Sequence, residues 1–524
     1  MGGKLDVPKQ TAGGTILAAW YSHDMDLKPK ATLTEADVKR GLRLVIGDGL
    51  AAEAMTALTG GAFLVAFALL MGASNFQIGL LAALPTFTNI FQLLSIWLVR
   101  QYNNRRAIAV ICLILARIPL IVIASLPLFF ETASIDILII FLFFFYFFSS
   151  IAGPAWNSWM KDLVPEKSLG RYFSRRSSYT QTVNVVMSFG LAMLVDYIKA
   201  NYPQYELTTY SVMFMTGGVL GIAGAIILGK TPEPQSYLAK ENLLKLFRRP
   251  LKNANFRKFL VFNSAWVFAL NIATPFFTVF LLKSMGLAFF YVIGLSIISQ
   301  VCSILTVRIW GHYSDRYSNK TIIAIGAPVY IFCLIAWCFV GIYSRFYANI
   351  ALLVFIHIFM GVSTAGINLS LTNIGLKLAP KDGAIVYLSV RNIITAFFSS
   401  VAPLLGGVLA DYFTDRSLTI NAEWIGPQVD KVIHILSLHE WNFLFAFGAL
   451  LALFAVEFLI GVKEVGEVEK DVVVRIMRSN IRSNLKDAFL IGQLINWNDQ
   501  FWRLLRGKKS EANDTLKESN ESVK

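Results

Sequence analysis

Charged side chains are scarce in this chain. Only 15% of its 524 residues are Asp, Glu, Lys or Arg, while 56% are hydrophobic, above the roughly 45–50% of ordinary soluble domains. A hydrocarbon layer about 30 Å thick is crossed by helices of about 20 apolar residues, and apolar runs of that length recur along the sequence. The composition excludes a disordered protein, a disulfide scaffold and a soluble multidomain enzyme, and it predicts an all-α polytopic membrane protein.

Cysteine is also rare. Cys112, Cys302, Cys333 and Cys338 all lie in apolar runs, where a cysteine packs as a small hydrophobe rather than bridging or binding metal. The sequence contains no P-loop, no His-Glu-x-x-His pattern and no Gly-x-Ser-x-Gly elbow, the motifs that would carry ATP-driven transport or hydrolysis. We therefore predict no enzyme activity, no metal and no cofactor.

What the chain does contain is a series of twelve apolar runs. They predict membrane spans at 43–70, 78–99, 107–130, 135–160, 178–199, 210–229, 259–284, 288–310, 321–343, 349–377, 384–411 and 441–462. The predicted domains are a cytoplasmic N-terminal tail (1–42), an N-terminal six-helix half (43–229), a basic linker (230–258), a C-terminal six-helix half (259–463) and a C-terminal tail (464–524).

The distribution of positive charge predicts the orientation. The first forty residues are polar, with no apolar core, so no cleavable signal peptide is expected. Cytoplasmic loops retain Lys and Arg, and placing both termini in the cytoplasm puts most of the 47 basic residues inside. The net charge of +14 then reflects sidedness, and no nucleic-acid partner is predicted.

An internal repeat relates the two halves. A shift of 215 residues without gaps superposes Ile78-Gly79-Leu80 on Ile293-Gly294-Leu295, and Asp196-Tyr197 on Asp411-Tyr412. Two parallel six-helix halves related by an axis along the membrane normal are typical of a transporter that rocks around a substrate site at mid-membrane. The repeat therefore predicts two pseudo-symmetric halves with the site between them.

The segment after the eighth predicted span carries a recognisable motif. Residues 311–320 read Gly-His-Tyr-Ser-Asp-Arg-Tyr-Ser-Asn-Lys, which resembles the Gly-x3-Asp-Arg-x-Gly-x-Lys/Arg signature of the major facilitator superfamily, with Ser318 at the second glycine. Residues 161–176 are similar to the second characteristic cytoplasmic segment of that superfamily. The resemblance covers residues 43–463 and implies a twelve-span secondary transporter.

The resemblance also implies a set of gating residues. Gly311 allows a close helix approach, and Asp315 can pair with Arg391, at the start of span 11, when the transporter is closed to the cytoplasm. The alternative is that both charges are ordinary interfacial groups solvated by water. The expected gating set is Gly311, Asp315, Arg316, Lys320, Arg391 and Arg176.

The first half departs from this signature. Ile96, Arg100 and Gln101 stand at the positions that match Gly311, Asp315 and Arg316, so the acidic partner is missing there. Arg100 is expected to meet Asp162 or Glu166 instead, which would make gating differ between the halves.

Polar residues inside the spans are the candidate substrate site. By analogy with the superfamily, spans 1, 4, 7 and 10 line the cavity, and amides beside aromatic rings suit hydroxyl-rich or amphipathic organic solutes. The alternative for each is a structural role, such as joining helices or, for His357, a packed and hydrogen-bonded ring. The candidates are Asp48, Glu53, Trp156, Asn157, Asn263, Trp266, Asn271, His357, Asn368 and Asn373.

Three intramembrane charges need a partner or access to water. Asp48 and Glu53 are five positions apart, so they lie about 140° apart around span 1 and cannot both face the cavity. We predict a structural pair between Glu53 and Arg117, with Glu53 as a titrating coupling group as the alternative.

The predicted function is secondary active or facilitative transport of a small organic solute by alternating access, with H+ or Na+ coupling or as a uniporter. There are two alternatives. One is efflux or flipping of amphipathic compounds, which an aromatic and amide-poor cavity would favour. The other is a sensor that does not transport. The expected partners are the solute, the coupling ion and the lipid bilayer, and the protein is expected to be a monomer.

The predicted exterior loops lack Asn-x-Ser/Thr, which favours a bacterial plasma membrane. Apolar residues spaced by four from Val473 to Phe489 predict an amphipathic helix, either on the inner leaflet or docked on the protein's own loops.

Overall fold

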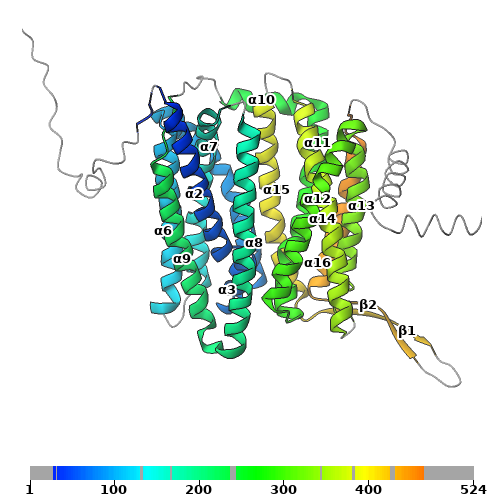
Figure 1. Ribbon diagram of the computed structural model, residues 1–524. Helices are drawn as coiled ribbons and strands as arrows, with labels where there is room; N and C mark the ends of the chain where they lie inside the picture. Colours follow the sequence, from blue (N-terminus) through cyan, green and yellow to red (C-terminus); the bar gives the residue numbers. More distant parts are fainter. Residues whose placement is uncertain are drawn as a thin grey trace, which may run out of the picture.

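The protein is a bundle of long helices standing side by side (Figure 1). The computed structural model describes residues 28–464 except 31, 130–133, 166–167, 236–242, 343–344, 380–383 and 425–430. Twelve helices within these ranges are long and apolar enough to cross a membrane. The prediction of an all-α protein with twelve spans is confirmed, whereas the amphipathic helix expected beyond Val473 lies outside the described residues.

The first six spans form the N-terminal half. They are α2 (Glu35–Thr59) with α3 (Gly61–Leu70), α4 (Asn75–Phe87) with η1 (Thr88–Phe91) and α5 (Gln92–Tyr102), α6 (Arg105–Phe129), α7 (Ile135–Leu163), α8 (Leu169–Asn201), and α9 (Glu206–Gly229), which follows the short η3 (Pro203–Tyr205).

The C-terminal half follows a short helix, α10 (Leu243–Lys252), in the linker. Its spans are α11 (Ala254–Val279) with η4 (Phe280–Ser284), α12 (Phe289–Arg316), α13 (Asn319–Trp337), α14 (Phe346–Lys377), α15 (Ala384–Phe413) and α16 (Trp441–Ile460).

Several helices are longer than the apolar runs that predicted them. The first begins at Glu35, eight positions before the expected start, because Thr34 and Asp37 form a capping box at its first turn. The fifth begins at Leu169 rather than 178. Polar turns extend these helices beyond the apolar segment, and a hydropathy pattern does not register them.

The connection between the last two spans is a β-hairpin, which the apolar runs did not predict. Strands β1 (Ser417–Trp424) and β2 (Lys431–His439) pair antiparallel, with Ser417 opposite His439 and a register shift after Ile420. The hairpin projects from one end of the bundle (Figure 1), which we call the hairpin end.

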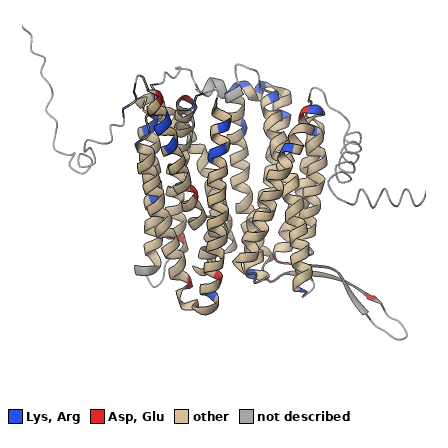
Figure 2. Cartoon of the chain, viewed as in Figure 1, with Lys and Arg blue, Asp and Glu red and all other residues tan. Residues whose placement is uncertain are grey.

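Lysine and arginine gather at the other end of the bundle (Figure 2). That end, called the basic end here, holds the start of α2, the whole of α10 and the end of α16 (Figure 1). Both halves are tightly packed inside, with Trp159 in the first half and Trp266, Trp337 and Trp441 in the second at most 2% exposed.

The two halves touch along two seams. In one, α4 packs on α15; in the other, α8 packs on α12. The rings of Phe189 and Phe290 lie 5.1 Å apart in the second seam, and Phe63 stacks on Phe289 beside it at 5.6 Å. These rings belong to the hairpin-end portions of their helices, so the halves are held together at that end.

Candidate functional site

Two carboxylates close the hairpin end across the seams. The Asp196 oxygens at the end of α8 accept the backbone N–H groups of Phe289 and Phe290, each at 2.8 Å. The Asp411 oxygens at the end of α15 accept those of Asn75 and Phe76 at 3.2 and 3.0 Å. Each carboxylate therefore satisfies orphan donors at the start of a helix in the opposite half.

The seam between α4 and α15 is closer than its counterpart. A Cβ atom on Gly79 would lie 2.2 Å from the carbonyl oxygen of Pro403, whereas one on Gly294, the equivalent position in the repeat, would meet no atom of the described residues within 4 Å. The α4–α15 seam thus requires glycine for backbone contact, and the α8–α12 seam does not.

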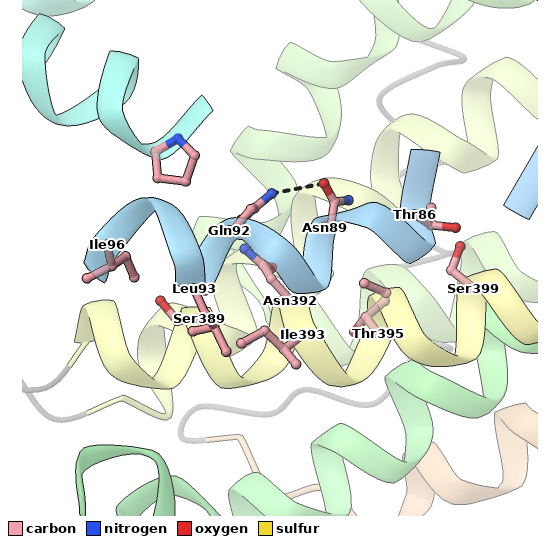
Figure 3. A pocket seen from close by; sticks show the side chains of 12 residues that line it. Thr86, Asn89, Gln92, Leu93, Ile96, Ser389, Asn392, Ile393, Thr395 and Ser399 are labelled. Atoms are coloured by element: carbon pink, nitrogen blue, oxygen red, sulfur yellow. Dashed lines mark hydrogen bonds between the residues drawn. The ribbon is translucent and has the colours of Figure 1, made fainter. Parts of the chain in front are cut away.

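A cavity of about 370 Å³ lies between the halves on the basic side of the first seam. We call it the inter-half groove, and Figure 3 shows its lining. The lining residues are Thr86, Asn89, Gln92, Leu93, Ile96, Pro154, Ser389, Asn392, Ile393, Thr395, Ala396 and Ser399. Its volume is that of a small-ligand pocket.

The chemistry of the inter-half groove is polar and uncharged. Seven of the twelve lining residues carry an amide or a hydroxyl, and none carries a charge. Gln92 donates to the Asn89 side-chain oxygen at 2.9 Å, as Figure 3 shows. Behind the wall, Asn263 donates to the Thr395 hydroxyl at 2.7 Å. The groove therefore presents oriented hydrogen-bonding groups at the junction of the two halves.

A second cavity, of about 310 Å³, lies between α2, α3, α8, α11 and α12. It includes Thr56, Asn184, Ser188, Ser296 and Gln300 in its lining. It borders the α8–α12 seam as the groove borders the α4–α15 seam, so the repeat places one cavity on each seam.

Asp48 is buried in α2 at 5% exposure and lies within the electrostatic reach of two arginines, Arg117 and Arg176. Arg117 is equally buried and donates to the Leu113 carbonyl at 3.2 Å. Arg176 lies over the Trp156 ring, 5.0 Å from its centroid, and donates to the Val45 carbonyl at 3.4 Å. These charges occupy the interior of the first half.

The predicted pair between Glu53 and Arg117 is wrong. Glu53 instead accepts a 2.8 Å hydrogen bond from the Asn184 amide on α8, while the acidic group whose charge acts on Arg117 is Asp48. The physical reason is the helical spacing of the two acids. Asp48 and Glu53 lie about 140° apart around α2, so they face different neighbours: Glu53 faces α8, and Asp48 faces α6 and α9.

The remaining candidates on spans 4 and 7 divide into packing and surface residues. Trp266 is 2% exposed and meets the Tyr330 ring edge-on. Asn271 donates to the carbonyl of Val267 on its own helix, and Asn157 is exposed on α7. None of these side chains lines either inter-half cavity.

The candidates on span 10 also lie away from the cavities. The His357 ring nitrogen Nδ1 is 2.8 Å from the Leu353 carbonyl, and the ring meets Trp337 edge-on. Asn368 is exposed. Asn373 donates to the Asn319 side chain at 3.1 Å, near the basic end.

The signature residues are separated in this structure. Asp315 is exposed at the end of α12, and Arg316 lies over the Tyr317 ring. Arg391 is half-buried over the Phe259 ring, and its Nε has no hydrogen-bond partner among the described residues. The Asp315–Arg391 contact is therefore not made, as expected when the basic end is open. Among the described residues, only Leu369 comes within 4 Å of the Cβ position of Gly311, at 3.8 Å.

Lys320 belongs to a network around Glu464, whose side chain is 3% exposed. The Glu464 carboxylate accepts the Lys320 N–H and the Asn319 amide, each at 2.8 Å, and pairs with Lys377 at 2.9 Å. Burial tends to raise the pKa of Glu464, but the hydrogen bonds from Asn319, Lys377 and Lys320 outweigh it and hold this pKa below its usual value. The network ties the chain after α16 to the start of α13.

The first half has the same arrangement after its sixth span. Glu233, 1% exposed, accepts the backbone N–H groups of Arg105 and Arg106 and the Arg105 side chain, all at 3.0 Å. Arg105 also pairs with Asp162. The acidic partner expected for Arg100 is thus bound by Arg105, and Glu166 lies outside the described residues.

Sequence reasoning missed the groove and the capping carboxylates. The repeat had aligned Asp196 with Asp411, and that shared position was the signal for the caps. The groove lies on α4, η1, α5 and α15, with Pro154 of α7 as its one lining residue from spans 1, 4, 7 and 10, to which the family analogy directed attention.

Comparison with known proteins agrees with this geometry. A model of the Major Facilitator Superfamily matches residues 49–403, well over half of the chain. The chain therefore belongs to the major facilitator superfamily, a family of membrane transporters.

Among solved structures, the nucleoside transporter NupG is similar, with 13% identity and a TM-score of 0.61 over 82% of this chain and 99% of that chain. The D-xylose-proton symporter has 14% identity and a TM-score of 0.56 over 83% and 98%. A bacterial homolog of the human lysosomal transporter Spinster, inward-facing and unoccupied, has 15% identity and a TM-score of 0.53 over 82% and 95%. At these identities the likeness establishes the fold. No curated protein sequence matches the chain.

Proposed function

We propose that the protein moves a small, uncharged, hydroxyl-bearing or amide-bearing solute across the membrane by alternating access. The observation that carries the proposal is the inter-half groove, whose seven amide and hydroxyl side chains are contributed by both halves. A solute bound there would contact side chains of both halves, so its release would require the halves to move apart. An aromatic, amide-poor cavity would have favoured efflux of amphipathic compounds, but this lining contains no aromatic residue and is rich in amides and hydroxyls.

The basic end is assigned to the cytoplasm in this proposal. Lys and Arg gather there (Figure 2), and cytoplasmic loops retain these residues. Because α2 begins and α16 ends at the basic end, this orientation supports both termini being in the cytoplasm, and the proposed membrane is the plasma membrane. The closure of the hairpin end by Asp196 and Asp411, together with the separation of Asp315 from Arg391, supports the proposal that this conformation is the one open to the cytoplasm.

Asp48 is the proposed coupling group, and the proton is the proposed ion. A sodium site would need several oxygen ligands, whereas the charges that act on Asp48 are those of two arginines. Among the described ion pairs there is none between Asp48 and Arg117, so the carboxylate can gain or lose a proton without breaking a closed pair. The D-xylose-proton symporter among the similar structures is compatible with this choice.

The binding part of the proposal is tested by solute exchange in proteoliposomes with a panel of neutral pentoses, hexoses and nucleosides. A hydrogen-bond donor or acceptor contributes about 0.5–1.5 kcal/mol, so Asn392→Ala is expected to weaken uptake of the transported solute by roughly threefold to tenfold. Asn157→Ala, exposed on α7 outside the groove, is the matched control. Equal uptake by both variants would remove the groove from the pathway.

Coupling is tested separately. Asp48→Asn should keep solute exchange and lose accumulation driven by a pH gradient, while Glu53→Gln, whose partner is the neutral Asn184, should keep both. Full accumulation by Asp48→Asn would exclude Asp48 as the coupling group.

A further inference from the structure

A third cavity lies between α11 and α15, beneath the linker helix α10. It measures about 460 Å³ and is lined by Leu251, Arg257, Leu260, Val261, Ser264, Ala265, Phe268, Ile394 and Phe398. Seven of these nine residues are apolar. We call it the α11–α15 crevice, and unlike the inter-half groove it involves one half only.

The length of the crevice corresponds to one leaflet of a bilayer. Its lining extends along α11 from Arg257 to Phe268, which at 1.5 Å per residue is about 16 Å. Half of a hydrocarbon layer is about 15 Å. The crevice therefore runs from the boundary at the basic end to about the middle of the membrane.

The walls of the crevice suit acyl chains better than water. Leu251, Val261 and Phe398 are 42%, 48% and 37% exposed. Apolar surface of this extent is unfavourable against water, and it is satisfied by hydrocarbon. A lipid tail lying along α11 would cover all three side chains.

The mouth of the crevice is basic. Arg257 lines the crevice and is exposed, Lys252 is exposed next to the lining residue Leu251, and residues 243–279, which include all of α10 and α11, contain no Asp or Glu. Neither of the two has an ion-pair partner among the described residues. Basic pockets between membrane helices attract anionic lipid head groups.

From the length, the apolar walls and the basic mouth of the crevice we propose that it binds an anionic phospholipid of the leaflet at the basic end. One acyl chain lies between α11 and α15, and the phosphate lies against Lys252 and Arg257. The lipid would rest against α15, the helix that also forms one wall of the inter-half groove.

The test uses the purified full-length protein in detergent, with bound lipid counted by native mass spectrometry. Titrations compare dioleoylphosphatidylglycerol, dioleoylphosphatidylcholine and glycerol 1-phosphate. Phosphatidylglycerol should bind at least fivefold more tightly than phosphatidylcholine, and glycerol 1-phosphate should not bind. Each basic residue near an anionic surface contributes about fivefold to binding affinity. The double variant Lys252→Gln with Arg257→Gln should therefore lower the affinity for phosphatidylglycerol by roughly tenfold or more.

Two further variants separate chain from head group. Lys283→Gln with Arg345→Gln removes two exposed charges at the hairpin end and should leave binding unchanged. Ala265→Phe fills the crevice and should lower the affinity for both phospholipids. Equal affinity for the two phospholipids, an unaltered affinity in the Lys252/Arg257 variant, or comparable binding of glycerol 1-phosphate would each overturn the proposal.

Discussion

Asp196 and Asp411 perform the same task on opposite seams of the bundle. Each ends a span of its own half and accepts two backbone N–H groups at the start of a span in the other half. Ala288, the N-cap of α12, has no side chain that could cap the helix, so Asp196 supplies the cap from across the seam.

Replacing these carboxylates should loosen the hairpin end. Hydrogen bonds to charged groups contribute about 1.5–3 kcal/mol, so Asp196→Asn and Asp411→Asn are each expected to shift the population toward a state open at the hairpin end. Spin labels across each seam, read by pulsed dipolar spectroscopy, would measure the shift. Asp136→Asn is the control, because Asp136 binds Gln77 within the first half. Unaltered distances in both cap variants would show that the caps do not hold the closure.

The unequal seams predict unequal responses to added volume. Gly79→Ala places a Cβ atom 2.2 Å from a backbone oxygen, while Gly294→Ala meets open space. Overpacking costs about 1–3 kcal/mol, so Gly79→Ala should lower the Tm in detergent, and Gly294→Ala should match the wild type. Similar Tm values for the two variants would contradict the close α4–α15 contact.

Glu464 predicts an acid-sensitive contact. Its pKa is lower in the folded protein than its usual 4.5, so its contribution is present above about pH 4.5 and is lost as the pH falls through the lower folded value. Glu464→Gln should therefore lower the Tm at pH 7 by an amount that shrinks at acidic pH. A Tm difference that stays constant with pH would show that the charge of Glu464 is not what matters.

Glu233 should contribute more to stability than Glu464, the equivalent residue of the second half. Breaking a buried pair costs about 3–5 kcal/mol, and the partners Arg105 and Glu233 are 2% and 1% exposed, whereas Lys377, the partner of Glu464, is 50% exposed. Glu233→Gln is thus expected to lower the Tm at pH 7 more than Glu464→Gln. The reverse order would show that burial does not rank these two networks.

The apolar runs and the repeat were sufficient to predict the twelve spans, though not the β-hairpin between the last two, because span length and hydropathy are set by the membrane rather than by tertiary partners. The site was less predictable. An intramembrane amide such as Asn263 can line a cavity or bind a neighbour, and only the packed structure shows that it donates to Thr395. The same holds for Asp48 and Glu53, whose partners come from helices far apart in the sequence.

The difference between Gly79 and Gly294 bears on the mechanics of the molecule. Where α4 meets α15, backbone lies against backbone, and such a contact can rotate but has little room to slide. Where α8 meets α12, the rings of Phe189 and Phe290 separate the helices, and rings can repack by changing rotamer. In the proposed transport cycle, the α4–α15 seam would therefore act as the pivot, and the α8–α12 seam would be the side that opens and closes.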